Sequence, residues 1–287
     1  NKITAIAGAE ATGKTFFALS ICNNFMKQNP KGGIVYFDTE GAITKELLEK
    51  RGMDPTGKQF LTIDCLTVED FRNVAYKILD KYNSQKEEDR QPMLMVLDSL
   101  GNLSTEKETK DIADGKSVRD MSKAQLVKGA FRVLTQKLSI AKVPLIVLNH
   151  TYDVIGSYMP TKEMGGGSGL KYAATTIIYL SKSQEKEGTE RVGNIIKAKV
   201  AKSRISKENE QVATRLYYDQ RGLDKYYGLL ELAEKGGIWK KVSTRYEVDG
   251  KKIYASEIYK NPEKYFTQEV LEKIDTVAKQ TFSYGEK

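Results

Sequence analysis

The feature that most restricts the possible folds of this chain is a short stretch near its beginning. Residues Gly8 to Thr15 read G-x-x-x-x-G-K-T and lie between an apolar run, Ile3–Ala7, and a helical pattern that extends to about Gln28. A strand, a glycine-containing loop and a helix in this order are the setting that a phosphate-binding loop requires. The glycines let successive backbone N–H groups face a phosphate, and the helix N-terminus adds its positive end. The chain is therefore expected to hold a nucleotide on an α/β scaffold.

The rest of the chain continues the alternation of short strands and helices. Apolar runs at Ile34–Asp38, Phe60–Ile63, Met93–Asp98 and Pro144–Asn149 are separated by amphipathic segments. This pattern is typical of a mostly parallel, twisted sheet with helices on both faces. Further strand-like runs lie at Thr175–Leu180, Asn194–Val200 and Val212–Tyr218. We predict an α/β core of the P-loop type over residues 1–222, with antiparallel strands at its C-terminal edge.

The remainder, residues 223–287, is predicted to be a small α+β region. It shows two helical patterns around Trp239 and one short strand at Lys252–Tyr254. Within the core, two segments interrupt the alternation, at about residues 101–118 and 151–172. The second contains Gly165, Gly166 and Gly167. A structureless segment of about 20 residues is uncommon in a compact domain and is usually functional or disordered, so both are predicted to be loops.

Composition excludes several classes of protein. Charged residues make up 29% of the chain, and no apolar run approaches the roughly 18 residues of a membrane span. The net charge of +8 suits a polyanionic partner. Cys22 and Cys65 have no metal-site spacing and are expected to be buried thiols in a reducing cytoplasm. The chain lacks a secretion signal but opens inside a strand, so an N-terminal segment is expected to be missing.

A phosphate-binding loop works together with a metal ion. Lys14 is expected to contact the β- and γ-phosphates of a nucleoside triphosphate, and the Thr15 hydroxyl is expected to bind Mg²⁺. The second metal residue is expected to be Asp98, which ends the apolar run Met93–Asp98. The alternative is that Asp98 only terminates a strand.

Hydrolysis also needs a group that orients water. Asp38 and Glu40 both follow the second strand, at the carboxyl edge where α/β sites form. Their spacing alone leaves the choice between them open. His150, the only histidine, lies at the same edge, although a lone histidine is more often structural than catalytic.

Several blocks of sequence occur in one order from the first residues to about residue 240. They are Gly8–Thr15, Tyr36–Glu40, Leu97–Leu103, Leu148–Tyr152, Met164–Gly169 and Lys202–Arg204. Together they resemble the RecA/RadA recombinase superfamily, and most closely the UvsX recombinases of T-even-type phages. The resemblance implies a RecA-type core and a DNA-dependent ATPase that forms helical filaments on single-stranded DNA and catalyses strand exchange in recombination, repair and replication.

The resemblance also implies cofactors and partners. The cofactors would be ATP and Mg²⁺. The partners would be single- and double-stranded DNA, further copies of the same chain, a recombination mediator and a single-strand-binding protein, in the cytoplasm and without a membrane. The family's N-terminal oligomerisation segment has no counterpart here. Leu47 stands where family members have an aromatic residue that stacks on adenine.

Individual residues receive roles from the resemblance. It implies that Glu40 rather than Asp38 activates water, and that Asn149 and His150 couple the γ-phosphate to the second DNA-binding loop. Lys202 and Arg204 fall on a basic pair that reaches ATP held by the neighbouring subunit; solvated strand charge is the alternative. The residues expected to contact nucleotide within one subunit are Gly8, Ala9, Glu10, Ala11, Thr12, Gly13, Lys14, Thr15 and Phe16.

The two predicted loops correspond to the family's DNA-binding loops. Basic side chains there would neutralise phosphates, glycines would allow close approach, and apolar side chains would wedge between bases. The residues expected to bind DNA are Lys107, Lys110, Lys116, Arg119, Tyr152, Ile155, Met159, Gly165, Gly166, Gly167 and Ser168. Flexible surface loops without DNA are the alternative.

Two other functions remain open. A hexameric DNA helicase with the same core would unwind a forked duplex, and a nucleotide-gated scaffold would bind no DNA. A fold does not determine a function, so the DNA hypothesis depends on the two loops and on the family resemblance. A titration with single-stranded DNA at several salt concentrations distinguishes the scaffold, which binds no DNA, from the recombinase.

Overall fold

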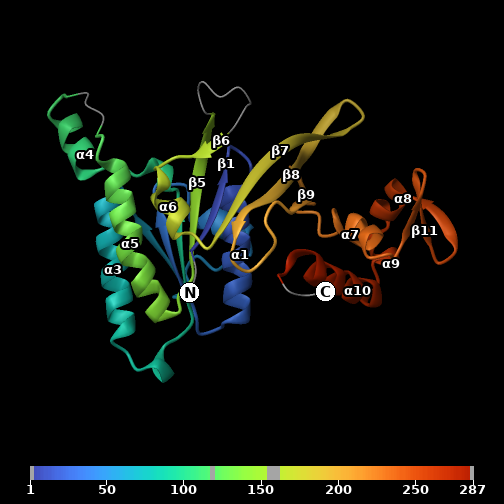
Figure 1. Ribbon diagram of the computed structural model, residues 1–287, viewed down its shortest axis with the longest axis horizontal. Coiled ribbons are helices and arrows are strands. Elements are labelled where there is room, and N and C mark those ends of the chain that lie inside the picture. Colours follow the sequence, from blue (N-terminus) through green and yellow to red (C-terminus); the bar gives the residue numbers. More distant parts are fainter. Residues whose placement is uncertain (1–2, 117–119, 154–161, 285–287) are drawn as a thin grey trace. The chain divides into compact units, whose positions relative to one another are not determined.

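The computed structural model describes residues 3–116, 120–153 and 162–284, and the chain divides into two compact units between Ile178 and Tyr179. In the first unit, parallel strands lie in the order β3, β2, β4, β5, β1. The neighbours β5 and β1 are labelled in Figure 1. Their bounds are β1 Ile3–Gly8, β2 Gly33–Asp38, β3 Phe60–Asp64, β4 Met93–Asp98 and β5 Leu145–Asp153. The register sets Asp38 beside Asp98 and Gly8 beside His150. The carboxyl ends of these strands therefore meet at one edge.

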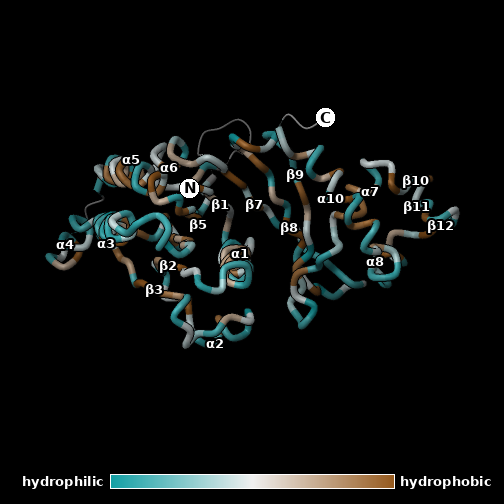
Figure 2. The backbone as a smooth tube through the Cα atoms, turned by 90° about the horizontal axis from the view of Figure 1, so that it is seen from below, coloured by the Kyte–Doolittle hydropathy of each residue, from teal (hydrophilic) through white to brown (hydrophobic). Residues whose placement is uncertain are grey.

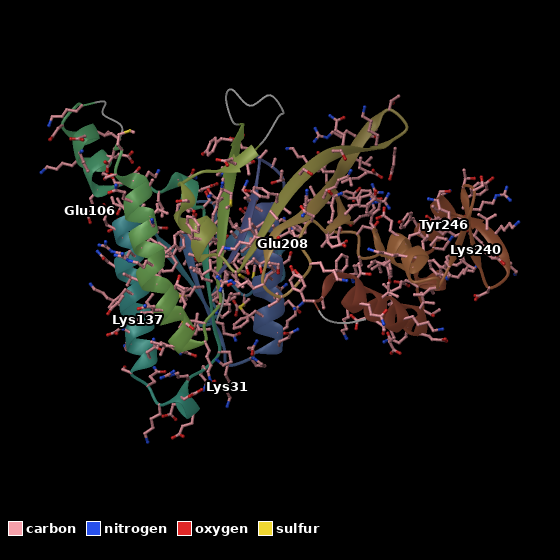
Figure 3. All side chains as sticks on the ribbon, viewed as in Figure 1. Lys31, Glu106, Lys137, Glu208, Lys240 and Tyr246 are labelled. Carbon is pink, nitrogen blue, oxygen red and sulfur yellow. The ribbon has the colours of Figure 1, made fainter. Side chains whose placement is uncertain are left out.

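Helices cover both faces of this sheet. The helices of the unit are α1 (Lys14–Gln28), α2 (Lys45–Lys50), α3 (Val68–Asn83), α4 (Glu106–Ala113), α5 (Lys123–Ala141) and α6 (Ser168–Ala173). α3 and α5 lie side by side on one face, and α1 lies on the other (Figures 1 and 2). Lys137 of α5 pairs with Asp80 of α3 along this helix contact (Figure 3).

The core of the first unit is built on aromatic and aliphatic side chains. Phe37 of β2 meets Phe71 of α3 edge to face, with ring centroids 5.0 Å apart, and Phe71 lies 6.3 Å from Phe131 of α5. All three are buried. Large aromatic side chains contribute much of the apolar area of a core, so these contacts fix α3 and α5 on the sheet.

The first predicted loop, 101–118, is helical in part. After a short 3₁₀ turn at Leu100–Asn102, α4 occupies Glu106–Ala113. The Thr105 hydroxyl accepts a hydrogen bond from the Glu108 N–H (3.0 Å), and the Glu108 carboxylate accepts one from the Thr105 N–H (3.1 Å). This reciprocal capping box starts the helix. The prediction of a loop was wrong here because α4 is almost entirely polar and leaves no apolar stripe in the sequence.

The second predicted loop, 151–172, also contains regular structure. β5 continues to Asp153, and β6 (Lys162–Met164) pairs with it antiparallel, with Thr151 opposite Met164. Residues 154–161 lie outside the described residues. The apolar run in the sequence predicts that the strand ends at Asn149. The strand instead continues through polar residues, which the apolar pattern does not mark.

The second unit contains antiparallel strands and a small mixed region. β7 (Thr176–Glu187) crosses the division between the units, and β8 (Glu190–Ser203) pairs antiparallel with β9 (Gln211–Tyr217). The later elements are α7 (Leu229–Lys235), β10 (Lys240–Val242), β11 (Arg245–Val248), β12 (Lys251–Tyr254), α8 (Ala255–Lys260), α9 (Pro262–Tyr265) and α10 (Gln268–Phe282). The predicted fold class is confirmed.

The last part of the second unit has its own apolar core. The rings of Trp239 and Phe266 lie 5.0 Å apart, and Tyr246 of β11 packs into the same cluster (Figure 3). The sequence predicted too few helices and strands here, because the elements are short and their apolar residues few. The domain boundary at residue 222 stays a prediction. None of the helices in the described ranges is both long and apolar enough to cross a bilayer.

Candidate functional site

A pocket of about 860 Å³ lies at the carboxyl edge of the parallel strands in the first unit. This is where ligand sites form in open α/β sheets. The lining residues are Ala9, Glu10, Ala11, Gly13, Lys14, Thr15, Phe16, Glu40, Asp98, Asn102, His150, Thr151 and Tyr152. Gly8 and Thr12 of the predicted loop are buried. One cavity therefore brings together the predicted catalytic residues, the predicted metal residues and most of the predicted phosphate loop.

The loop between β1 and α1 turns through left-handed backbone. Gly13, the N-cap of α1, has a φ of 85°, and Ala11 has a φ of 54°. Glycine adopts this conformation without steric cost. The Thr12 hydroxyl donates to the Ala9 carbonyl at 2.8 Å and closes the turn. Because the first N–H groups of a helix have no intrahelical acceptor, the loop and the start of α1 form a cradle for an anion.

The ammonium of Lys14 lies against this loop. Its Nζ donates to the carbonyl oxygens of Gly8 (3.1 Å) and Ala9 (3.0 Å), and the residue is only 7% exposed. These bonds hold the positive charge beside the loop, in the position where it would meet the β- and γ-phosphates of a nucleotide.

Asp98 is the centre of a buried hydrogen-bond cluster. Its Oδ2 accepts from the hydroxyls of Thr15 and Tyr36, each at 2.7 Å. Burial raises the pKa of the Asp98 carboxyl, and the two donors oppose that shift. Burial also raises the pKa of Tyr36, with a further contribution from the Asp98 charge. Tyr36 therefore stays protonated and donates.

Thr15 and Asp98 fit a magnesium ion that arrives with a nucleotide. Mg²⁺ prefers oxygen ligands, keeps several waters and is held in such sites by one or two protein groups together with phosphates. The Thr15 hydroxyl and the Asp98 carboxylate are oxygen donors, are bonded to each other and line the same pocket. The two predicted metal residues are thus adjacent.

The two acids after β2 occupy different environments. Asp38 is buried, and its oxygens accept from the N–H groups of Glu40 (3.0 Å) and Ile43 (2.9 Å). It therefore shapes the turn after β2. Glu40 lines the pocket, accepts from the Ser99 hydroxyl (3.1 Å) and lies 3.3 Å from Nε2 of His150. This geometry favours Glu40 as the acid that faces a substrate, as the resemblance implied.

A chain of hydrogen bonds joins this acid to the second predicted loop. His150 follows Asn149, whose Oδ1 accepts from the His150 N–H at 2.9 Å. The Asn149 amide donates to the Gly165 carbonyl (2.9 Å), and the Gly165 N–H donates to the His150 carbonyl (3.2 Å). Asn149 is fully buried. The contacts run from Glu40 through His150 and Asn149 to Gly165. A role of Asn149 and His150 as a sensor pair stays a prediction.

Tyr152 lines the pocket and also a second cavity of about 520 Å³. The second cavity is bordered by Gly101 of the first predicted loop, by Gly165, Gly166 and Gly167 of the second, and by Asp120. A Cβ atom on Gly165 would lie 2.8 Å from Cε2 of Tyr152, so the ring packs directly on that backbone. Gly166 and Gly167 have φ values of 81° and 72°, which favour glycine.

The three lysines predicted to bind DNA phosphates are exposed. Lys107 and Lys110 belong to α4, and Lys116 follows it. The Lys107 ammonium lies 4.0 Å from Asp120, and that of Lys116 lies 3.5 Å from Asp114. Such long pairs to solvated ammonium groups are weak, so a phosphate can replace them. Ser168 is exposed at the start of α6; Arg119, Ile155 and Met159 lie outside the described residues.

Lys202 and Arg204 lie in the second unit, at the end of β8. The Ser203 hydroxyl between them accepts from the N–H groups of Ile205 (3.2 Å) and Ser206 (2.9 Å) and fixes the turn. Burial lowers the pKa of Lys202, and the nearby Arg204 charge lowers it further. Two neighbouring cations suit an anionic ligand, but their action on another subunit stays a prediction.

Sequence reasoning missed several residues of the site. Asn102 and Thr151 line the pocket, the Tyr36 and Ser99 hydroxyls donate to the carboxylates of Asp98 and Glu40, and the Thr39 hydroxyl accepts from the Ser99 N–H. One signal was available for Tyr36. It is a tyrosine inside the apolar strand β2, and a buried hydroxyl needs a partner, which the acid of the neighbouring strand could provide.

Comparisons with known proteins place the chain among recombination proteins by sequence similarity. The family model described as the RecA N-terminal domain matches residues 1–224. The "Recombination and repair protein" of Enterobacteria phage T4 is 33% identical over 233 residues, which are 81% of this chain and 57% of that protein. The "Protein RecA" of Arthrobacter sp. (strain FB24) is 29% identical over 258 residues, 88% of this chain and 68% of that protein.

A further relative extends the similarity to another genus. The "Protein RecA" of Streptomyces rimosus is 27% identical over 254 residues, which are 88% of this chain and 64% of that protein. The chain spans little more than half of the phage protein and about two thirds of the bacterial ones. The similarity therefore covers most of this chain but only part of each relative.

Proposed function

The chain belongs to the RecA N-terminal domain family, and from this premise we propose that it acts in an ATP-dependent DNA recombinase. In this proposal it forms filaments on single-stranded DNA and catalyses homologous pairing and strand exchange. The observation that supports this proposal best is the series of hydrogen bonds from Glu40 in the pocket to Gly165 in the second loop. The names of the relatives, a recombination and repair protein and RecA, support the same activity.

The pocket is proposed to bind ATP. The loop from Gly8 to Thr15 would cradle the phosphates, with Lys14 near the β- and γ-phosphates. Bound Mg²⁺ would neutralise phosphate charge between Thr15 and Asp98. The volume of about 860 Å³ supports this, because it lies within the usual range for small-molecule sites.

Glu40 is proposed to orient the attacking water. Its carboxylate is held by the Ser99 hydroxyl and lies within reach of His150, so it is fixed at the mouth of the pocket. An acid in this role accepts a proton or a hydrogen bond from water as the water attacks. Lys202 and Arg204 are proposed to supply positive charge to ATP held by a neighbouring subunit, as arginine fingers do. Hydrolysis would then depend on filament assembly.

The loop residues are proposed to hold single-stranded DNA. Lys107, Lys110 and Lys116 would contact phosphates, the Gly165–Gly167 backbone would approach them closely, and Tyr152 would stack on a base. ATP would favour the DNA-binding state, and DNA would in turn favour ATP binding. A recombination mediator, a single-strand-binding protein and a cytoplasmic location belong to the same proposal.

The test is ATP hydrolysis measured with and without single-stranded DNA, followed by strand exchange between a single strand and a homologous duplex. We expect DNA to stimulate hydrolysis and electron microscopy to reveal helical filaments with an ATP analogue. Unwinding of a forked duplex without strand exchange would indicate a helicase. Nucleotide binding with no salt-sensitive DNA binding would indicate a scaffold. Either result would contradict the proposal.

A further inference from the structure

We propose that Tyr36 is a positioning residue of the metal site, whose hydroxyl holds the Asp98 carboxylate in the orientation that receives Mg²⁺ together with Thr15. This inference rests on the proposed function, because it assumes that Asp98 and Thr15 bind the magnesium of the nucleotide. The phosphate-loop motif does not include Tyr36, which lies on the second strand.

The tyrosine ring is fixed by its surroundings. Tyr36 has no exposed surface, and its ring stacks on Phe60 of β3 with centroids 5.6 Å apart and an interplanar angle of 29°. β2 pairs with β3 on one side and β4 on the other. Because close-packed cores leave little room for a ring of this size to change rotamer, the hydroxyl has one position, 2.7 Å from Oδ2 of Asp98.

The strand register explains how the hydroxyl reaches the acid. Asp38 of β2 lies beside Asp98 of β4, and Tyr36 precedes Asp38 by two positions. Side chains two residues apart on a strand point to the same face, so Tyr36 and Asp98 share one face of the sheet. A long side chain spans the diagonal between neighbouring strands, and a short side chain at position 36 would leave Asp98 without this donor.

The two donors to Asp98 differ in what else they do. Thr15 donates from a hydroxyl whose oxygen is also a proposed metal ligand, and it lines the pocket. Tyr36 is fully buried and cannot touch a nucleotide. It therefore acts only through Asp98. Loss of one partner from a buried charged group has a substantial cost.

The experiment replaces Tyr36 with phenylalanine, which keeps the ring and removes only the hydroxyl. Binding of a fluorescent ATP analogue is titrated with Mg²⁺, and its affinity is also measured in EDTA. We expect Tyr36→Phe to raise the Mg²⁺ concentration for half-maximal tightening by about tenfold, the effect of losing one hydrogen bond to a charged group. Affinity in EDTA should stay unchanged.

Two further variants make the test specific. Tyr82→Phe removes a hydroxyl that donates to the Gln91 carbonyl at 2.8 Å, and it should leave the Mg²⁺ requirement unchanged. In an Asp98→Asn background, Tyr36→Phe should cause no further rise, because contacting residues that act through each other are not additive. Thermal unfolding of each variant establishes that it is folded.

The inference is overturned if Tyr36→Phe has the Mg²⁺ requirement of the wild type, or loses equal affinity in EDTA, or adds its full effect to Asp98→Asn. These results differ from a failure of the proposed function. If the wild-type protein itself binds the analogue with no dependence on Mg²⁺, the metal site is wrong and the role of Tyr36 falls with it.

Discussion

The nucleotide pocket and the two loop segments of the first unit are built in opposite ways. Asp98, which lines the pocket, and Asn149, which precedes the lining residue His150, are almost completely buried, and their side chains make short hydrogen bonds. On the first loop segment, Lys107 and Lys110 are exposed, and the ion pair between Lys107 and Asp120 is long, at 4.0 Å. The buried polar groups of the pocket are held in place by the fold, whereas the exposed lysines of the loop act through their charge. Substitutions should therefore have large, specific effects in the pocket and small, additive effects on the loop.

The largest effect is expected for Lys14→Ala. The ammonium beside the loop is the only positive charge within the Gly8–Thr15 motif. Its loss should therefore reduce ATP hydrolysis by roughly a hundred- to thousand-fold, the size seen when one preorganised donor is removed. Steady-state hydrolysis and nucleotide titration measure this. Lys31→Ala, at an exposed site (Figure 3), is the control. Unchanged nucleotide affinity in Lys14→Ala would refute the phosphate cradle.

Glu40→Gln should have the next largest effect. It keeps the shape of the side chain and removes the charge that accepts a proton, so single-turnover hydrolysis should fall by about a hundred-fold. ATP affinity should remain within about twofold, because uniform binding is untouched. Asp38→Asn, at the acid that shapes the turn after β2, should instead lower thermal stability. If Asp38→Asn abolished hydrolysis in a stable protein and Glu40→Gln did not, the assignment of the two acids would be reversed.

The sequence predicted the residues of the pocket better than the contacts between residues of different strands. Lys14, Thr15 and Asp98 were predicted from a motif and from the end of an apolar run, whereas Glu40 was preferred to Asp38 only through the family resemblance. Tyr36 was missed because its role depends on the register between β2 and β4, which a single strand pattern does not contain. Contacts between residues distant in sequence arise from packing, and hydrophobic periodicity reports only which face is buried.

The loop segments were predicted less well for a related reason. The capping box of Thr105 and Glu108 was present in the sequence but was overlooked, because α4 has no apolar stripe. The continuation of β5 to Asp153 accompanies its pairing with β6, and the two paired segments are not contiguous in the sequence. The structure of both segments is determined by hydrogen bonds rather than by the burial of apolar side chains.

Asn149→Ala should have an intermediate effect and should test the link between the two regions. It removes the bonds to Gly165 and His150 while leaving the phosphate loop intact. We expect the stimulation of ATP hydrolysis by single-stranded DNA to fall by about tenfold, since a buried polar link of about 1.4 kcal/mol is lost. ATP affinity without DNA should change little. Asn83→Ala is the matched control, because it removes a hydrogen bond from the Asn83 side-chain amide to the Lys137 carbonyl.

The smallest effects are expected on α4. Lys107→Ala and Lys110→Ala should each weaken single-stranded DNA binding only a few-fold and lower the slope of log affinity against log salt by roughly 0.7 per lost phosphate contact. Fluorescence anisotropy over a salt series measures both quantities. Lys50→Ala on α2, at another exposed lysine, should leave the slope unchanged. Equal slopes for all three variants would place the DNA elsewhere.

The central claim is that the nucleotide pocket and the second DNA-binding loop are coupled. The most direct test compares the affinities for DNA and for an ATP analogue in a thermodynamic cycle. Single-stranded DNA binding is measured with and without a non-hydrolysable ATP analogue, and analogue binding is measured with and without DNA. Linkage requires the two ratios to be equal, and the contacts from Glu40 to Gly165 predict that both exceed one and approach one in Asn149→Ala. Ratios of one in the wild-type protein would contradict a coupling between the nucleotide pocket and the DNA-binding loop.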